Sequence, residues 1–493
     1  MIEWRVLGTA VTLFLLFIAG FALVQFAAPG LVGNDGYYHM KMGYLIRTEG
    51  LTPAFSYLPL TILNEAAFYD HHMLYHAYLA LFATVDPALD GGFALTQGAK
   101  WASVVLPALA FVAVWWLLRG QRVPYAPVWT LALFAVSEPF LYRMSMPRAQ
   151  SMSLLLLVLG LHWLFKQKYQ WLLPLGFVFV WAYNAFPLLL VMAGVYVIAT
   201  LLLERRFVWQ ALLFPAIGIG LGLMINPYFP QNISFILDHL APKLGESATK
   251  VGNEWSPYRT WTLVENSAGA LTAVLIGILA LGWHEKRIGK QTLVVLGLTV
   301  LFGYMLFESR RFVEYFPPFA LIFAVLAVSP ILQEWGEKRP LFHKIAPVLL
   351  VMLLAYPLYV TVEDGRSLVQ RSKDADHYAA ATIWLHENSE PESQIFQTDW
   401  DDFTRLFFYN SQVSYTAGLD PTFFELENES LFETWVSITR GEVDNPGDTI
   451  RDKFDSDYIF SDVRHDDFLE QADKDPTLVE LYRDDDAVIF AVK

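Results

Sequence analysis

Long apolar segments recur along roughly the first three quarters of the chain and are separated by short polar stretches. The first segment, residues 6–28, is long enough to cross about 30 Å of hydrocarbon as a helix. Ten further segments have the same character, so the pattern predicts a polytopic α-helical membrane protein with about eleven transmembrane helices embedded in a lipid bilayer. The other expected helices occupy residues 95–118, 124–142, 150–165, 170–182, 184–203, 207–225, 264–284, 291–307, 313–332 and 344–361. Residues 72–85 are apolar but too short to span, and they predict an interfacial or re-entrant helix.

Basic residues indicate how the chain is oriented. They fall in every second short loop, and the positive-inside rule places those loops in the cytoplasm. The two long loops, residues 29–94 and 226–263, and the C-terminal region then lie outside. We therefore expect a multi-pass protein of a prokaryotic plasma membrane with a cytoplasmic N-terminus and its largest polar segments on the extracytoplasmic side. The basic residues that support this orientation are Arg5, Arg119, Arg122, Lys166, Lys168, Arg205, Arg206, Lys286, Arg287, Lys290, Lys338, Arg339 and Lys344.

The C-terminal quarter has a different composition. Residues 363–493 hold 31 acidic and 11 basic residues, a balance of −20, whereas the whole chain carries −15. Short stretches rich in apolar and β-branched or aromatic residues predict strands at 393–398, 412–416, 458–461 and 487–492, with helices between them. The chain thus divides into a transmembrane domain, residues 1–361, and a soluble acidic α/β domain, residues 362–493. This acidic excess opposes nucleic-acid binding, and the absence of cysteine excludes thiol chemistry.

The first external loop carries the residues most suited to hold a cation. Asp35 and His39 are four positions apart and would share a helix face, while Asp70, His71 and His72 are consecutive. Oxygen and imidazole ligands of this kind suit Mg²⁺ or Mn²⁺ held against a diphosphate. The alternative is an aqueous loop in which the acids cap helices and the histidines pack at the membrane interface.

Two other external loops contain residues that suit catalysis or phosphate binding. Glu254 is either a general base or a carboxylate that orients the acceptor. The alternative is a surface residue that caps a helix or pairs with Arg259. Arg310 and Arg311 lie outside against the positive-inside bias, which indicates an anionic partner such as a phosphate. Arg143 and Arg148 lie in another external turn and add to this indication. The alternative for the two adjacent arginines is an ion pair with a glutamate of their own loop, Glu308 or Glu314.

A carboxylate cluster follows the first predicted strand of the C-terminal domain. It comprises Asp399, Trp400, Asp401 and Asp402. These side chains either bind the hydroxyl groups of a substrate or cap the helix that follows.

These features resemble the GT-C glycosyltransferases, and within them the catalytic subunit of oligosaccharyltransferase. The run Gly-Asn-Asp-Gly-Tyr-Tyr-His at residues 33–39 is similar to that family's first acidic motif, where the aspartate helps to bind a divalent metal and orients the acceptor. A long external loop bearing a functional glutamate, four spans with an external arginine, and an external α/β domain also match the family's layout. Residues 396–403 look like a variant of its Trp-Trp-Asp-Tyr-Gly signature, which in that family recognises the acceptor peptide.

The resemblance also shows departures. Residues 143–150, the stretch comparable to the family's second acidic loop, contain no acid. In the outer motif, Asp399 replaces the first tryptophan, Asp402 replaces the tyrosine and Phe403 replaces the glycine. An acceptor other than a peptide sequon is therefore as consistent with the sequence as a true oligosaccharyltransferase.

The resemblance implies a glycosyltransferase that uses a polyprenyl-(di)phosphate-linked sugar and a protein, glycan or lipid acceptor. It implies that Asp35 binds metal or acts as base and that Glu254 positions acceptor or metal. The other implied roles are metal or donor binding by His39, Asp70, His71 and His72, donor-phosphate binding by Arg148, Arg310 and Arg311, and acceptor contact by Trp400 and Asp401. Alternatives are a polysaccharide polymerase or ligase of the O-antigen type, a transporter of lipid-linked glycans, and a non-catalytic assembly protein.

Overall fold

The computed structural model of the protein describes residues 4–244, 252–283 and 288–493. Lys286, Arg287 and part of the predicted loop 226–263 lie outside these ranges. Contacts within the chain define two compact units. The first, here the helical unit, comprises Met1–Ala28, Trp101–Ile225 and Gly252–Ser372, and the second, here the sheet unit, comprises Pro29–Lys100, Asn226–Val251 and Lys373–Lys493. The predicted division into domains at residues 361 and 362 stays a prediction.

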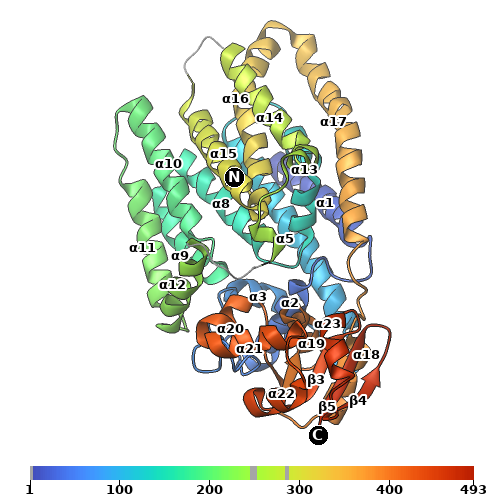
Figure 1. Ribbon diagram of the computed structural model, residues 1–493. Coiled ribbons are helices and arrows are strands. Elements are labelled where there is room, and N and C mark those ends of the chain that lie inside the picture. The colour runs from blue at the N-terminus through green and yellow to red at the C-terminus, as the bar shows by residue number, and fades with distance from the viewer. Residues whose placement is uncertain (1–3, 245–251, 284–287) are drawn as a thin grey trace. The chain divides into compact units, whose positions relative to one another are not determined.

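Within the described residues, six helices are long and apolar enough to cross a membrane (Figure 1). They are α1 (Trp4–Gln25), α5 (Phe93–Gly120), α10 (Pro187–Glu204), α15 (Lys290–Glu308), α16 (Phe316–Lys338) and α17 (Pro340–Val369). Their outer faces carry bare apolar side chains, such as Leu353 of α17, which is 71% exposed. Since water disfavours such a surface and hydrocarbon does not, this is a multi-pass membrane protein.

The remaining predicted spans are bent or short helices. Two bent pairs pass the same test together: α7 (Glu138–Ser145) with α8 (Gln150–Phe165), at 107°, and α13 (Thr260–Asn266) with α14 (Ala268–Trp283), at 80°. The shorter apolar helices are α6 with η1 (Ala126–Ala135), η2 with α9 (Tyr169–Ala182) and α11 (Gln210–Met224). The expected single helix at 124–142 is wrong, because the chain breaks before α7, where the Ser137 hydroxyl accepts a hydrogen bond from Phe140 N and caps the new helix.

The sheet unit contains a five-stranded mixed sheet in the order β2-β1-β3-β5-β4. The strands are β1 (Gln394–Gln397), β2 (Ser414–Tyr415), β3 (Ser456–Asp462), β4 (Leu478–Arg483) and β5 (Ala487–Val492). Strand β1 runs parallel to both β2 and β3, whereas β5 is antiparallel to both β3 and β4. Four of the five strands lie where the sequence predicts them. The pattern missed β4 because most of its side chains are partly or fully exposed.

Consecutive strand residues point to opposite faces of this sheet and enter two different hydrophobic clusters. Ile395 and Phe460 join one cluster, while their neighbours Phe396 and Ile459 join the other. The first cluster also contains Tyr38 of α2 (Asp35–Glu49), so the first long loop covers one face of the sheet. The other short elements are α3 (Met73–Ala80), α4 (Pro87–Asp90), α12 (Gln231–Leu244), η3 (Asn253–Trp255), η4 (Arg310–Glu314), α18 (Ala379–Asn388), η5 (Trp400–Asp402), α19 (Phe403–Tyr409), α20 (Pro421–Glu427), α21 (Glu429–Thr439), α22 (Pro446–Phe454) and α23 (Asp466–Ala472).

Candidate active site

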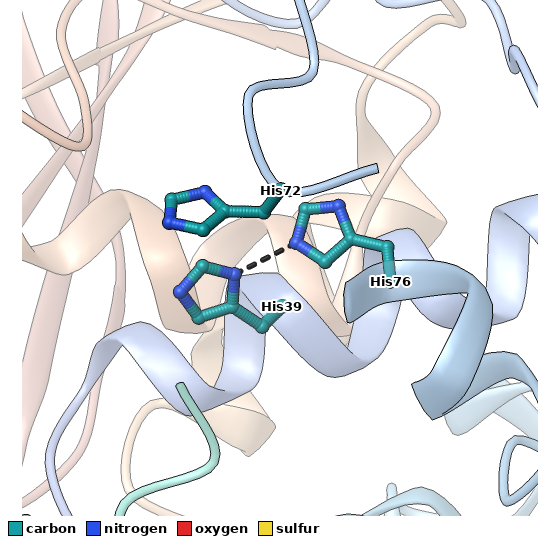
Figure 2. A group of neighbouring side chains, drawn as sticks. All are labelled: His39, His72 and His76. Atoms are coloured by element: carbon teal, nitrogen blue, oxygen red, sulfur yellow. Dashed lines mark hydrogen bonds between the residues drawn. The ribbon is translucent and has the colours of Figure 1, made fainter. Parts of the chain in front are cut away.

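Three histidines converge in the sheet unit (Figure 2). His39 lies on α2, His72 directly precedes α3, and His76 lies in the first turn of α3. His76 N donates to His72 O at 2.8 Å, which places these two residues one helical turn apart. One ring nitrogen from each histidine lies within 4.8 Å of the others, and Nδ1 of His39 lies 2.7 Å from Nε2 of His76. The three imidazoles are therefore close enough to share one ion.

Asp70 orients His76 from the side of the imidazole ring that faces away from the other two histidines. Its Oδ2 lies 2.7 Å from His76 Nδ1, and its Oδ1 accepts from His72 N at 3.0 Å. The side chains of both Asp70 and His76 are almost fully buried. Because both carboxylate oxygens already accept hydrogen bonds from the protein, Asp70 acts on the cluster through His76.

The cluster differs from the set expected from the sequence. It contains His39 and His72 together with His76, a residue that sequence analysis did not assign. The His-x-x-x-His spacing of residues 72 and 76 was the available signal, since it puts two imidazoles on one helix face. His71 stacks on Phe235 with ring centroids 5.1 Å apart. Asp35 lies one turn before His39 on α2 but is not a member of the histidine group.

Asp35 belongs instead to an acidic neighbourhood with Asp401. Burial and then the negative charge of Asp35 raise the pKa of the Asp401 carboxyl. Asn34 Nδ2 donates to Asp401 Oδ2 at 2.7 Å, and Arg405 Nε donates to Asn34 Oδ1 at 3.2 Å. The buried Arg405 also lies 4.2 Å from the centre of the Tyr37 ring. Sequence analysis missed Arg405, because nothing local distinguishes it from a solvent-exposed helix arginine.

Two further residues of the outer motif, Asp399 and Trp400, have structural partners. Asp399 Oδ1 accepts from Asp401 N at 3.0 Å and caps η5, as the capping alternative predicted. Trp400 is half-buried and packs against the second hydrophobic cluster of the sheet. Among Asp399, Trp400 and Asp401, the Asp401 carboxylate is therefore the group best suited to bind a ligand.

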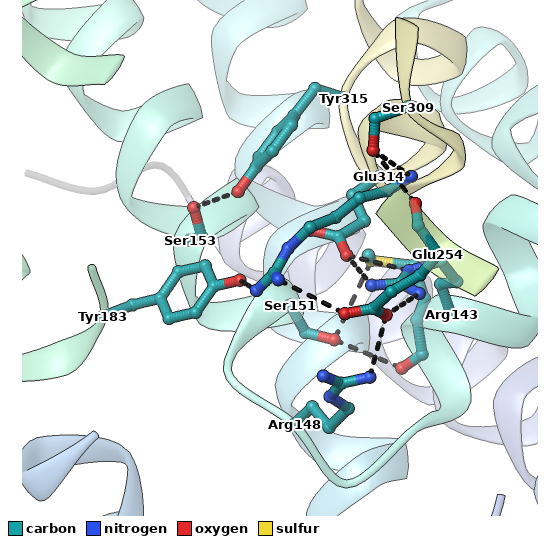
Figure 3. A network of polar contacts seen from close by, with 11 residues as sticks. Arg143, Arg148, Ser151, Ser153, Tyr183, Glu254, Ser309, Glu314 and Tyr315 are labelled. Carbon is teal, nitrogen blue, oxygen red and sulfur yellow. Dashed lines mark hydrogen bonds and ion pairs between the residues drawn. The ribbon is translucent and has the colours of Figure 1, made fainter. Parts of the chain in front are cut away.

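A second cluster lies in the helical unit, where three arginines converge on Glu254 (Figure 3). Oε2 of Glu254 accepts from Arg143 Nη1 at 3.0 Å and from Arg148 Nη1 at 3.3 Å. Its Oε1 accepts from Arg311 Nη1 at 3.3 Å. Nearby arginines hold the pKa of Glu254 far below its usual range and overcome the opposing effect of burial. Glu254 is thus ionised at neutral pH and is a weak proton acceptor.

The arginines are held in place by further contacts. The buried carboxylate of Glu314 pairs with Arg143 through Nη2 and through Nε at 2.8 Å. Arg311 Nη2 donates to Tyr183 OH at 2.5 Å. Ser309 Oγ donates to the backbone oxygen of Glu254 at 2.9 Å, so the two loops that carry the cluster are bonded to each other. Three arginines and two glutamates leave the cluster with one excess positive charge.

The three arginines expected to bind a phosphate do not all lie in this cluster. Arg148 and Arg311 join the cluster, together with Arg143, which lies in the same predicted external turn as Arg148. Arg310 donates instead to Pro257 O at 3.2 Å and lies over the ring of Tyr258, 5.2 Å from its centre. The surface pairing of Glu254 with Arg259 does not occur among the ion pairs of the described residues.

Comparisons of sequence and structure give different results. No protein-family model matches the chain, and no curated protein sequence is significantly similar to it. Among solved structures, the oligosaccharyltransferase AglB from Archaeoglobus fulgidus, in complex with an inhibitory peptide and a dolichol-phosphate, matches with a TM-score of 0.67 at 14% identity, covering 93% of this chain and 70% of that one. ArnT from Cupriavidus metallidurans, bound to undecaprenyl phosphate, matches with a TM-score of 0.56 at 12% identity over 100% and 98% of the two chains. The mycobacterial arabinofuranosyltransferase AftD matches at 0.57 and 13% identity, over 98% of this chain and 41% of that one.

These matches confirm the predicted fold class. The protein has the GT-C fold, with a polytopic helical region and a C-terminal α/β region containing a small sheet. At 12–14% identity the likeness establishes the fold. The activity has to be argued from the side chains.

Proposed function

We propose that the protein is a membrane glycosyltransferase. It transfers a sugar or oligosaccharide from a polyprenyl-(di)phosphate-linked donor to a protein, glycan or lipid acceptor on the extracytoplasmic face of a prokaryotic plasma membrane. The observation that carries the proposal is the convergence of Arg143, Arg148 and Arg311 on one carboxylate within a GT-C fold. The solved AglB and ArnT structures of the same fold hold polyprenyl phosphates, which supports this class of donor.

The arginine cluster suits the leaving group of such a reaction. When the bond between sugar and phosphate breaks, negative charge develops on the phosphate oxygens, and fixed guanidinium groups stabilise it. Here three guanidinium groups converge on one anionic group, the carboxylate of Glu254. We assign donor-phosphate binding to Arg143, Arg148 and Arg311, and we assign to Glu254 the role of a counter-ion that spaces them. A carboxylate with so low a pKa gives a general base little driving force.

Acceptor activation is assigned to Asp35. It lies in the first turn of α2, one helical turn before His39. The neighbouring Asp401 and the half-buried ring of Trp400 are assigned to acceptor contact. Asp401 is fixed by Asn34, which supports a binding role rather than a mobile surface position.

A divalent cation was expected from the sequence, as Mg²⁺ or Mn²⁺. Mg²⁺ prefers oxygen ligands in octahedral geometry, whereas the group of described residues that converges is made of three imidazoles. This donor set does not fit Mg²⁺, so no step of the proposed reaction is routed through it.

The test uses the full-length protein in detergent or nanodiscs, with undecaprenyl phosphate as the probe. Arg311→Ala should weaken binding by about tenfold to a hundredfold, since hydrogen bonds between charged groups contribute about 1.5–3 kcal/mol. The matched variant Arg310→Ala removes the adjacent arginine, whose side chain lies outside the cluster, and should change binding by less than about threefold. Equal losses in the two variants would contradict the assignment. The absence of binding by the wild-type protein would contradict the proposed donor class.

A further inference from the structure

We propose that His39, His72 and His76 form a binding site for a divalent transition-metal ion of the Zn²⁺ class. The site is distinct in ligand type from the Mg²⁺ or Mn²⁺ site that the sequence suggested. The proposal rests on the geometry of the three imidazoles and on the carboxylate behind one of them. Metal binding by this site does not depend on the proposed transferase activity.

The ligand atoms are already gathered. One nitrogen from each histidine lies within 4.8 Å of the other two. Two nitrogens bound to one tetrahedral Zn²⁺ at about 2.0–2.1 Å stand roughly 3.3 Å apart. The closest pair, His39 Nδ1 and His76 Nε2, stands at 2.7 Å, where a shared proton holds the two rings together. To share one ion, the closest pair has to open from 2.7 Å, and any pair near the 4.8 Å limit has to close, toward this spacing.

The origin of the ligands also fits a metal site. His72 and His76 are one helical turn apart, the spacing with which two histidines present ligand atoms from one face of a helix. His39 comes from a different helix, α2, which packs against α3. The ion would therefore connect two helices of the sheet unit, and three protein ligands leave a fourth position for water or another group.

Asp70 supplies the outer partner that a ligating histidine requires. A proton on His76 Nδ1 is shared with Asp70 Oδ2 at 2.7 Å, so the lone pair of Nε2 points toward the other histidines. A carboxylate placed behind a ligating imidazole fixes the orientation of its ring. The second oxygen of Asp70 is held by the backbone of His72, which locks the carboxylate as well.

The donor atoms decide the class of ion. Imidazole nitrogens suit Zn²⁺, Fe²⁺, Ni²⁺ and Cu²⁺, whereas Mg²⁺ and Ca²⁺ require oxygen ligands. His39 lies one turn beyond Asp35 on α2, so the ion would also fix the turn that presents Asp35. This last role, unlike the metal binding, rests on the proposed function, and it makes the three histidines positioning residues.

The test measures metal binding directly on the full-length protein after chelator dialysis. We expect about one Zn²⁺ per chain by elemental analysis, and bound Co²⁺ should show the visible absorption of a site with nitrogen ligands. His72→Ala removes a half-buried ligand and should lower Co²⁺ affinity by at least about a hundredfold. Asp70→Asn should lower it by about 10–100-fold. The matched control is His71→Ala, because His71 is adjacent in sequence but stacks on Phe235, and it should stay within about twofold of the wild-type protein.

Two outcomes would overturn the proposal. The first is the absence of stoichiometric Zn²⁺ or Co²⁺ in the wild-type protein, which would leave Asp70, His76 and His39 as a purely structural hydrogen-bonded chain. The second is displacement of Co²⁺ by a small excess of Mg²⁺, which would show a site of oxygen ligands. Neither measurement depends on glycosyl transfer or on binding of undecaprenyl phosphate, so failure of this proposal is distinguishable from failure of the proposed function.

Discussion

Oδ2 of Asp70 lies 2.7 Å from Nδ1 of His76, and both side chains are almost fully buried. The pair connects the loop before α3 to the helix itself. Replacing Asp70 by alanine would leave a buried imidazole nitrogen without an acceptor, which costs about 1–3 kcal/mol. We expect Asp70→Ala to lower the thermal unfolding midpoint of the full-length protein by several degrees. His71→Ala is the comparison, and an equal loss there would show that the loop, not the Asp70–His76 bond, sets the stability.

A different loss is expected at the two glutamates of the arginine cluster. Glu314 has a side-chain exposure of 1% and pairs with Arg143, whereas Glu254 has an exposure of 25%. Removing one member of a buried ion pair leaves an uncompensated charge and costs about 3–5 kcal/mol. Glu314→Ala should therefore destabilise the protein much more than Glu254→Ala in the same thermal unfolding measurement. A larger loss in Glu254→Ala would contradict the packing described here.

The counter-ion role of Glu254 predicts that removing its charge strengthens anion binding. Glu254→Gln keeps the size of the side chain but removes its charge, which raises the net positive charge around Arg148 and Arg311. Affinity for undecaprenyl phosphate should rise by about tenfold at low salt, and less at high salt because of screening. A fall in affinity would show that the Glu254 carboxylate is required to position the arginines.

Asp35 should matter for transfer and little for folding. General-base catalysis contributes about 10²–10⁴-fold to a rate, so Asp35→Asn should reduce glycosyl transfer by at least about a hundredfold. The asparagine keeps the shape of the side chain in the first turn of α2, and the unfolding midpoint should change only slightly. Transfer by Asp35→Asn at the wild-type rate would remove Asp35 from the proposed reaction.

Lys41 gives the sheet unit a defined dependence on pH. It is buried on α2, and burial lowers the pKa of its ammonium group to about 8. A lysine in the unfolded chain titrates near 10.4. Below pH 8 the lysine is charged in both the folded and the unfolded protein. The folded state then carries the full free-energy cost of burying the ammonium charge. Between about pH 8 and 10.4 the folded state releases its proton first, so the contribution of Lys41 to stability rises with pH.

The prediction is that Lys41→Met is more stable than the wild-type protein at pH 7, by roughly 1–3 kcal/mol. This advantage should shrink as the pH rises from 8 to 10. The measurement is the difference between the unfolding midpoints of the two proteins at a series of pH values. A difference that is constant over this range would show that Lys41 is not the titrating group.

The sequence by itself determined the class of protein and the position of most elements. Apolar runs of about 20 residues leave few alternatives to a membrane helix, and short stretches rich in apolar and aromatic residues placed four of the five strands. It also placed Asp35 and His39 on one helix face and identified Arg148, Arg311 and Glu254 as unusual external charges. These features are local, because apolar runs, helical spacing and charge bias depend only on residues that are close together in the sequence.

Only the tertiary structure decided which side chains meet. Arg143 and Glu314 are 171 positions apart, and Asn34 and Asp401 are 367 apart. Neither pairing has a local signature, because such contacts depend on how helices and loops pack. The same holds for the separation of Arg310 from Arg311, which the sequence treats as equivalent. A one-residue step along η4 turns one guanidinium toward Pro257 and the other toward Glu254, and that choice is made by the packing of the two loops.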